Sequence, residues 1–76
     1  MNNIDITIGI PTFNEEGNIR KFFNSLKKQL LTQDGSVEVV FVDESEDKTS
    51  QIIDDLRLNN PTLNIHLIHN NDRKGV

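Results

Sequence analysis

The sequence predicts an α/β fold in which three parallel strands alternate with two helices. Apolar residues recur at every second position over residues 4–10, with a helical spacing over residues 19–30, and almost continuously over residues 37–42. Strands and helices that alternate with short connections give two right-handed crossovers and a parallel sheet, most simply in the spatial order 3-2-1. The 76 residues show no repeat and no internal boundary, so we expect one domain, residues 1–76.

The first strand and the first helix are separated by a change of apolar period. Over residues 4–10 isoleucine alternates with small or polar residues, which predicts a strand that Pro11 ends. From Asn14 onward the spacing becomes helical, with an apolar stripe at Ile19, Phe22, Phe23, Leu26 and Leu30. We expect this stripe to face the sheet and the basic residues of the opposite side to face solvent.

The second half of the chain repeats the alternation of strand and helix. Residues 37–42, VEVVFV, are almost wholly apolar, which predicts a central strand covered on both faces in a three-layer arrangement. A second helix is expected from about Asp47, with Ile52, Ile53 and Leu56 facing inward, until residues 59–61, NNP, end it. The third strand is predicted at residues 63–69, LNIHLIH.

The composition argues against several classes of partner. With 12 acidic and 8 basic residues the net charge is −4, which disfavours broad attraction to nucleic acid or anionic lipid. The chain has no cysteine, so we expect neither disulfides nor thiolate metal sites. It shows no signal-peptide pattern and no apolar run long enough to span a membrane. We therefore expect a cytoplasmic protein that binds a small ligand.

The polar residues best placed to bind a ligand follow the first two strands. In an open parallel sheet these loops, residues 11–18 (PTFNEEGN) and 43–49 (DESEDKT), meet at the carboxyl edge. Neither loop contains a glycine pattern that cradles phosphate. Their carboxylates would repel phosphate, but they accept hydrogen bonds from a base edge or from sugar hydroxyls, and Phe13 offers a ring for stacking. This pattern favours a site for base and ribose, with the phosphates neutralised by a cation bound elsewhere.

Several of these residues also have structural explanations. Asn14 and Glu15 suit the N-terminus of a helix, so capping and ligand binding both remain open for them. Asp47 is expected to cap the second helix, and Thr49 is expected to be structural. Asp43 follows a buried apolar run, where an unpaired carboxylate is costly, and this position favours a functional role.

The histidines and the last basic residues carry weaker signals. His66 and His69 lie three residues apart in a predicted strand and would face opposite sides, which argues against a shared metal. We interpret both as ordinary residues. Arg73 and Lys74 either neutralise phosphate oxygens or belong to a frayed basic end.

The loop sequences resemble those of family 2 glycosyltransferases. The segments IGIPTFNEEGNI, VEVVFVDESEDKT and IHNNDRKGV follow one another as in the first half of that family's nucleotide-binding domain. That half is a Rossmann-like βαβαβ fragment of the GT-A fold group, which includes dolichyl-phosphate mannose synthases. The family pattern Pro-x-aromatic-Asn-Glu is met at Pro11, Phe13, Asn14 and Glu15. The pattern Asp-(Asp)-x-Ser-x-Asp-x-Thr is met at Asp43, Ser45, Asp47 and Thr49. Two positions depart from it: Phe13 replaces the commoner Tyr, and Glu44 stands where many members have Asp or Gly.

The resemblance implies transfer of a sugar from a nucleoside-diphosphate sugar, linked to UDP or GDP, to an acceptor. It implies that the base and ribose are bound by Pro11, Phe13, Glu15, Asp43 and Glu44. Members of the family use a divalent metal, Mg²⁺ or Mn²⁺, held by an Asp-x-Asp motif that these 76 residues lack, and they often act on membrane-associated acceptors. We therefore expect the chain alone to bind nucleotide weakly and to transfer no sugar.

Other functions and a mode of assembly also follow from the sequence. The alternative function is a non-catalytic α/β module for nucleotide binding or protein interaction. A phosphoacceptor receiver domain is disfavoured, because its first strand would end in an acidic pair and this one ends in Pro11 and Thr12. In family 2 glycosyltransferases the first strand is interior and pairs with a fourth strand that these 76 residues lack. One edge of the first strand, residues 4–10, would therefore be unpaired in this chain. We expect self-association through this edge or through the exposed side of the sheet.

Overall fold

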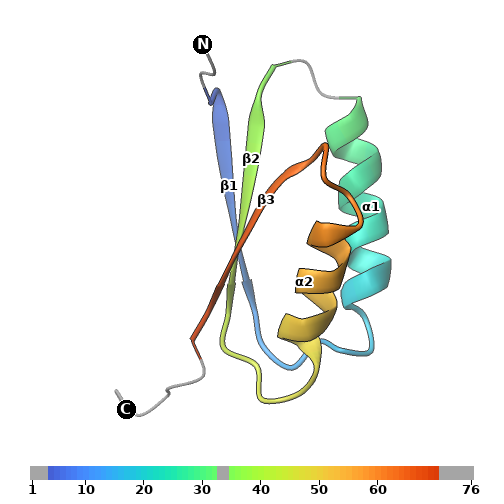
Figure 1. Cartoon of the computed structure of the whole chain (residues 1–76), viewed down its shortest axis with the longest axis vertical. Helices are drawn as coiled ribbons and strands as arrows, with labels where there is room; N and C mark the ends of the chain where they lie inside the picture. The colour runs from blue at the N-terminus through green and yellow to red at the C-terminus, as the bar shows by residue number, and fades with distance from the viewer. Residues whose placement is uncertain (1–3, 33–34, 71–76) are drawn as a thin grey trace.

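A computed structural model describes residues 4–32 and 35–70 and shows three strands and two helices in alternation (Figure 1). The elements are β1 (Ile6–Thr12), α1 (Ile19–Leu31), β2 (Val37–Asp43), α2 (Thr49–Leu58) and β3 (Asn64–His69). β2 lies in the centre of the sheet and pairs in parallel with β1 on one side and β3 on the other. The α/β class and the spatial order of the strands are confirmed.

Both helices pack on the same face of the sheet (Figure 1). The chain moves from β1 to β2 and from β2 to β3 in one direction across the sheet, so two right-handed crossovers must place both helices on one side. The expectation that β2 is covered on both faces is therefore wrong for the described residues, which form two layers. On the uncovered face Val40 is half-buried and Val42 is 40% exposed.

A small apolar core fills the space between the helices and the sheet. Its buried members are Ile19, Phe23, Val39, Phe41, Ile53, Leu56 and Ile65. Every element except the edge strand β1 contributes at least one of them, and β1 adds half-buried Ile8 and Ile10. None of the helices in the described residues is long and apolar enough to cross a membrane.

β1 continues through Pro11 to Thr12, which corrects the expectation that Pro11 ends it. The N–H of Ile6 donates to the carbonyl of Ser36 (3.1 Å), and the carbonyl of Thr12 accepts from the N–H of Glu44 (3.1 Å). The backbone N–H and C=O groups of the even-numbered residues of β1 therefore point toward β2. Pro11 is odd-numbered, so its backbone nitrogen points away from β2, toward the open edge of the sheet. A proline at this position costs no hydrogen bond of the sheet.

α1 begins at Ile19, five residues later than expected from the apolar period. Asn14 has a φ of +50°, which is incompatible with a right-handed helix, and residues 15–18 form a turn in which Glu15 accepts hydrogen bonds from the N–H groups of Asn18 and Ile19 (both 2.8 Å). Phe22 was expected to face inward but is 44% exposed. It lies at the border of the apolar stripe, beside the open edge of β1.

Candidate functional site

The carboxyl ends of the strands align three polar side chains. The register places Asp43 opposite Thr12 on one side and opposite His69 on the other. Asp43 is completely buried, and its Oδ1 accepts hydrogen bonds from the hydroxyls of Thr12 and Ser45 (2.6 Å from Ser45). Its Oδ2 accepts the N–H of Ser45 (3.1 Å). Hydrogen bonds from within the protein thus offset the cost of burying this carboxylate.

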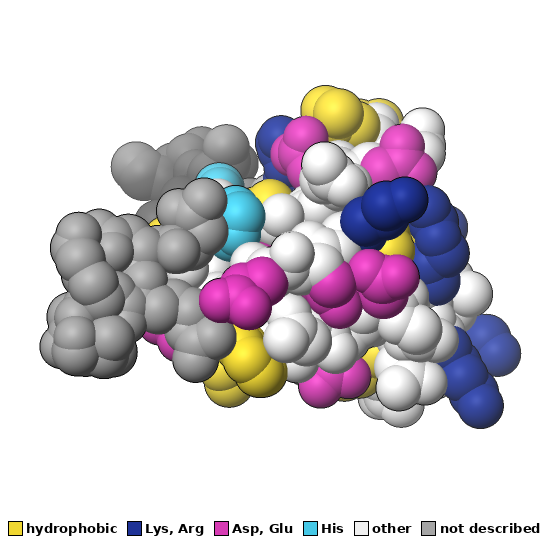
Figure 2. Space-filling model, turned by 90° about the horizontal axis from the view of Figure 1, so that it is seen from below, with side chains coloured by type: hydrophobic (Ala, Val, Ile, Leu, Met, Phe, Trp, Pro, Cys, Tyr) yellow, Lys and Arg dark blue, Asp and Glu magenta, His cyan; other side chains and the backbone are white. Residues whose placement is uncertain are grey.

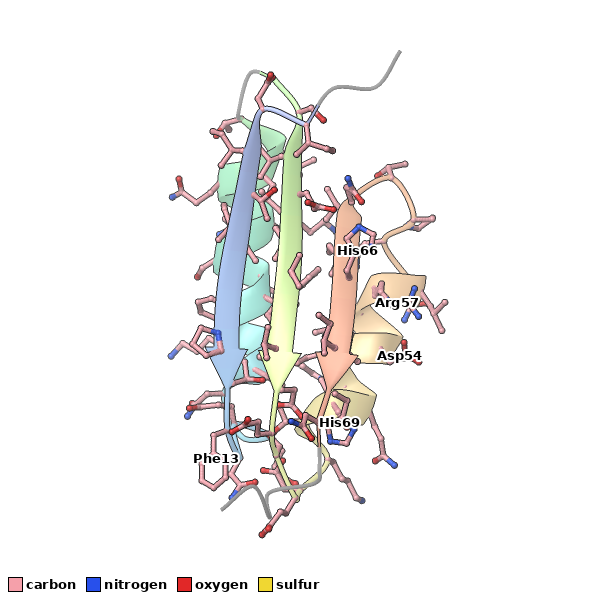
Figure 3. The ribbon with its side chains drawn as sticks, turned by 90° about the vertical axis from the view of Figure 1, so that its left-hand side faces the viewer. Phe13, Asp54, Arg57, His66 and His69 are labelled. Carbon is pink, nitrogen blue, oxygen red and sulfur yellow. The ribbon has the colours of Figure 1, made fainter. Side chains whose placement is uncertain are left out.

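His69 completes this row, although the sequence pattern indicated an ordinary residue. Its Nε2 lies 3.3 Å from the carbonyl oxygen of Ser45 and 3.5 Å from Oδ2 of Asp43. Both neighbours are acceptors, so Nε2 can hydrogen-bond to them only in a form of the ring that carries a proton on this nitrogen. The signal that could have revealed His69 is its place at the end of the third predicted strand, on the carboxyl edge where ligands bind in parallel sheets. His66 lies on the other face, 3.1 Å from Glu38 (Figure 3).

The two loops are joined by hydrogen bonds that run in both directions. Three consecutive N–H groups of the first loop donate to side chains of the second: Asn14 to Ser45 (2.6 Å), Glu15 to Thr49 (2.8 Å) and Glu16 to Asp47 (3.2 Å). Two N–H groups of the second loop donate to side chains of the first: Glu46 to Asn14 (2.8 Å) and Lys48 to Glu16 (2.9 Å). Each loop therefore satisfies backbone groups of the other.

Asp47 holds the beginning of α2 as well as the first loop. Its Oδ1 accepts hydrogen bonds from the N–H (2.9 Å) and the hydroxyl (2.5 Å) of Thr49, the first residue of the helix. Partial burial is the largest single influence on its pKa and raises it. The hydrogen bonds from Thr49 and from the N–H of Glu16 together outweigh this effect, so that the pKa of Asp47 lies below its ordinary value.

An open hollow of about 370 Å³ lies beside the two loops at the carboxyl edge. Its lining consists of Pro11, Thr12, Phe13, Glu15, Val42 and Glu44. Four of the five residues predicted for the base and ribose therefore share one hollow, whereas Asp43 is buried and is not part of its lining. Phe13 is 46% exposed and lies at the carboxyl end of β1 (Figure 3).

A second hollow of about 290 Å³ lies between β1 and α1. It shares Pro11, Thr12 and Glu15 with the first hollow, but its other lining residues are Ile10, Asn18, Ile19 and Phe22. Phe22 is therefore an exposed phenylalanine close to the first hollow but outside it.

Several acidic side chains lie on the face that carries the loops. Seen from the carboxyl ends of the strands, carboxylates spread across the middle of this face, and Lys and Arg side chains lie toward the helices (Figure 2). The side chains at 4–32 and 35–70 include no group of three or more His, Asp or Glu residues that could hold a metal ion. Arg73 and Lys74, predicted as phosphate contacts, lie outside the described residues.

The fold and the hollow define the class of protein: an α/β domain with a candidate ligand site at the carboxyl edge of a parallel sheet. A sequence model of the family described as Glycosyl transferase family 2 matches residues 7–76, and the chain belongs to this family. Comparisons with curated proteins and with solved structures gave no match.

Proposed function

We propose that the chain forms the base- and ribose-binding part of a glycosyltransferase whose donor is a nucleoside-diphosphate sugar. The observation that carries this proposal is the hollow in which an exposed aromatic ring, Phe13, lies with two carboxylates, Glu15 and Glu44, in a member of family 2. A planar ring offers a stacking surface to a base, and carboxylates accept hydrogen bonds from base N–H groups and ribose hydroxyls.

The same hollow is unsuited to bare phosphate. Carboxylates repel phosphate, and the N–H groups of Asn14, Glu15 and Glu16, which could otherwise bind an anion, already donate to the second loop. The diphosphate of a UDP- or GDP-linked sugar would therefore extend away from the loops. The divalent metal and the acceptor of the transfer step remain predictions from the family, as does the likeness to dolichyl-phosphate mannose synthases.

Burial suggests different roles for the two adjacent acidic residues of the second loop. Glu44 is exposed and lines the hollow, so it is the carboxylate available to a base or ribose. Asp43 is completely buried beneath the loops, where it orients Ser45 and Thr12. We propose that Glu44 binds the nucleotide and that Asp43 supports the site.

Calorimetric titration of the chain with UDP and GDP tests the proposal. For an open hollow with one stacking contact and a few hydrogen bonds, we expect a Kd of about 1 mM. Phe13→Ala should weaken binding roughly fivefold, as loss of about 1 kcal/mol of stacking implies. Phe22→Ala is the matched control, because Phe22 is equally exposed but lies outside this hollow. Equal losses for the two variants, or no binding by the unmodified chain, would refute the proposed site.

A further inference from the structure

We propose that Asn14 is a positioning residue that fixes the turn from which Phe13 is presented to the base. This inference rests on the proposed function, because it concerns the same hollow. Asn14 is not among the residues that line the hollow. Its role is therefore indirect, through the backbone conformation that it imposes on the first loop.

The conformation of Asn14 is the first observation. Over residues 4–32 and 35–70, Asn14 is the one non-glycine residue with a positive φ, at +50°. This left-handed region disfavours most side chains, by about 1 kcal/mol or more, whereas asparagine enters it comparatively readily. Such a conformation persists only where the surroundings hold it.

Hydrogen bonds on both sides of the residue hold this conformation. The N–H of Asn14 donates to Oγ of Ser45 (2.6 Å), and Oδ1 of Asn14 accepts the N–H of Glu46 (2.8 Å). The hydroxyl proton of Ser45 is directed to Oδ1 of Asp43 (2.6 Å), which leaves the oxygen free to accept the N–H of Asn14. The buried carboxylate thus orients Ser45, and Ser45 in turn holds Asn14.

The turn decides where the preceding ring lies. Thr12 is anchored at the end of β1 by its hydrogen bonds to Asp43 and Glu44. Asn14 is anchored to the second loop, so Phe13 is fixed from both sides while its ring stays exposed over the hollow. A residue at position 14 that returned to negative φ would turn the chain in another direction and carry the ring away from this position.

Nucleotide titration of a double-mutant cycle tests this inference, with UDP and GDP as the probes. Asn14→Ala loses the Oδ1 acceptor and disfavours positive φ, so it should weaken binding about as much as Phe13→Ala, roughly fivefold. In the Phe13→Ala background, Asn14→Ala should cause no further loss. Asn14→Asp keeps both the acceptor and the tolerance of positive φ, and it should bind within about twofold of the unmodified chain.

A glycine variant and a measurement without nucleotide complete the design. Asn14→Gly permits positive φ but lacks the acceptor, so it should fall between Asn14→Asp and Asn14→Ala; it replaces the alanine variant in the cycle if that variant does not fold. In the free protein, amide exchange of Glu46 should speed up in the alanine and glycine variants and stay slow in Asn14→Asp. Failure of the unmodified chain to bind nucleotide would defeat the proposed function. If the unmodified chain binds but the losses of the two substitutions multiply in the cycle, the role of Asn14 is contradicted while the proposed function stands. The same holds if Asn14→Asp binds as weakly as Asn14→Ala.

Discussion

Two neighbouring acidic residues, Asp43 and Glu44, differ in almost every physical respect. Asp43 is fully buried at the end of the central strand and accepts three hydrogen bonds from Thr12 and Ser45, whereas Glu44 is exposed at the hollow. The two adjacent acidic residues therefore differ in accessibility: Asp43 is a buried structural carboxylate, and Glu44 is a carboxylate that a ligand can reach. Substitutions that remove the charge with little change of shape separate these roles.

Asp43→Asn should lower the stability of the fold, whereas Glu44→Gln should not. An amide at position 43 turns one acceptor into a donor that faces other donors, which costs about 2–3 kcal/mol for a buried group. Chemical denaturation should show this loss for Asp43→Asn and a change within about 0.5 kcal/mol for Glu44→Gln. Nucleotide titration should show weaker binding for Glu44→Gln. Unchanged stability of Asp43→Asn would contradict its structural role.

Asp47 should make the stability of the fold depend on pH under acidic conditions. Its pKa in the folded protein lies below the ordinary value, since the hydrogen bonds from Thr49 and Glu16 favour the charged form more than burial disfavours it. Its stabilising contribution is present above the unfolded-state pKa of about 3.9 and is lost as the pH falls through the lower folded pKa. Denaturation of the chain and of Asp47→Asn between pH 6 and pH 2, at about 25 °C, measures it. The stability difference between them should shrink as the pH falls; a constant difference would contradict this account.

At the scale of the elements, no strand of residues 4–32 and 35–70 pairs with the outer edge of β1, and this edge lacks the usual protection. Its residues Ile6–Thr12 include no charged side chain, and Ile6 is 43% exposed. Edge strands are commonly kept from pairing by charges, by bulges or by proline, and β1 has only Pro11, near its end. The opposite edge, at β3, is followed by residues outside the described part of the chain.

We predict that the chain self-associates through the open edge of β1. Sedimentation velocity should show association that increases with concentration, and Ile6→Lys should reduce it by placing a charge at this edge. Ile68→Lys is the control, because Ile68 is also exposed, at 55%, but lies on β3. A larger effect of Ile68→Lys would assign the association to the uncovered face of the sheet, and a strict monomer at high concentration would contradict the prediction.

At the scale of the whole molecule, the alternation of strand and helix periods was sufficient to predict the parallel sheet, and the simplest order of its strands, 3-2-1, is the one observed. Local patterns misplaced the ends of elements where tertiary contacts decide them. β1 continues through Pro11 because this residue lies on an open edge. α1 begins later than expected because the second loop holds Asn14 in a left-handed conformation. Two right-handed crossovers in the strand order 3-2-1 require both helices on one face, so the described residues form two layers and not three.

The proximity of four predicted residues could be expected from the sequence, whereas the burial of the fifth, Asp43, could not. Pro11, Phe13, Glu15 and Glu44 share one hollow because their loops follow adjacent parallel strands. The burial of Asp43 depends on the packing of side chains from three strands, and the contact with His69 depends on the register between β2 and β3. Neither the packing nor the register can be read from the spacing of residues along one chain.

Chemical-shift mapping of the chain during titration with UDP and GDP, with and without Mn²⁺, tests the central claim most directly. We predict saturable shifts centred on the amides of Phe13, Glu15 and Glu44, because these residues line the hollow. The shifts should be similar with and without Mn²⁺, because the proposed contacts are stacking and hydrogen bonds from side chains. The amides of Leu30, Gly35 and Leu63, which line a hollow at the opposite end of the sheet, should not move. Shifts confined to that opposite end, or no shift up to about ten times the expected millimolar Kd, would contradict a nucleotide site at the carboxyl edge.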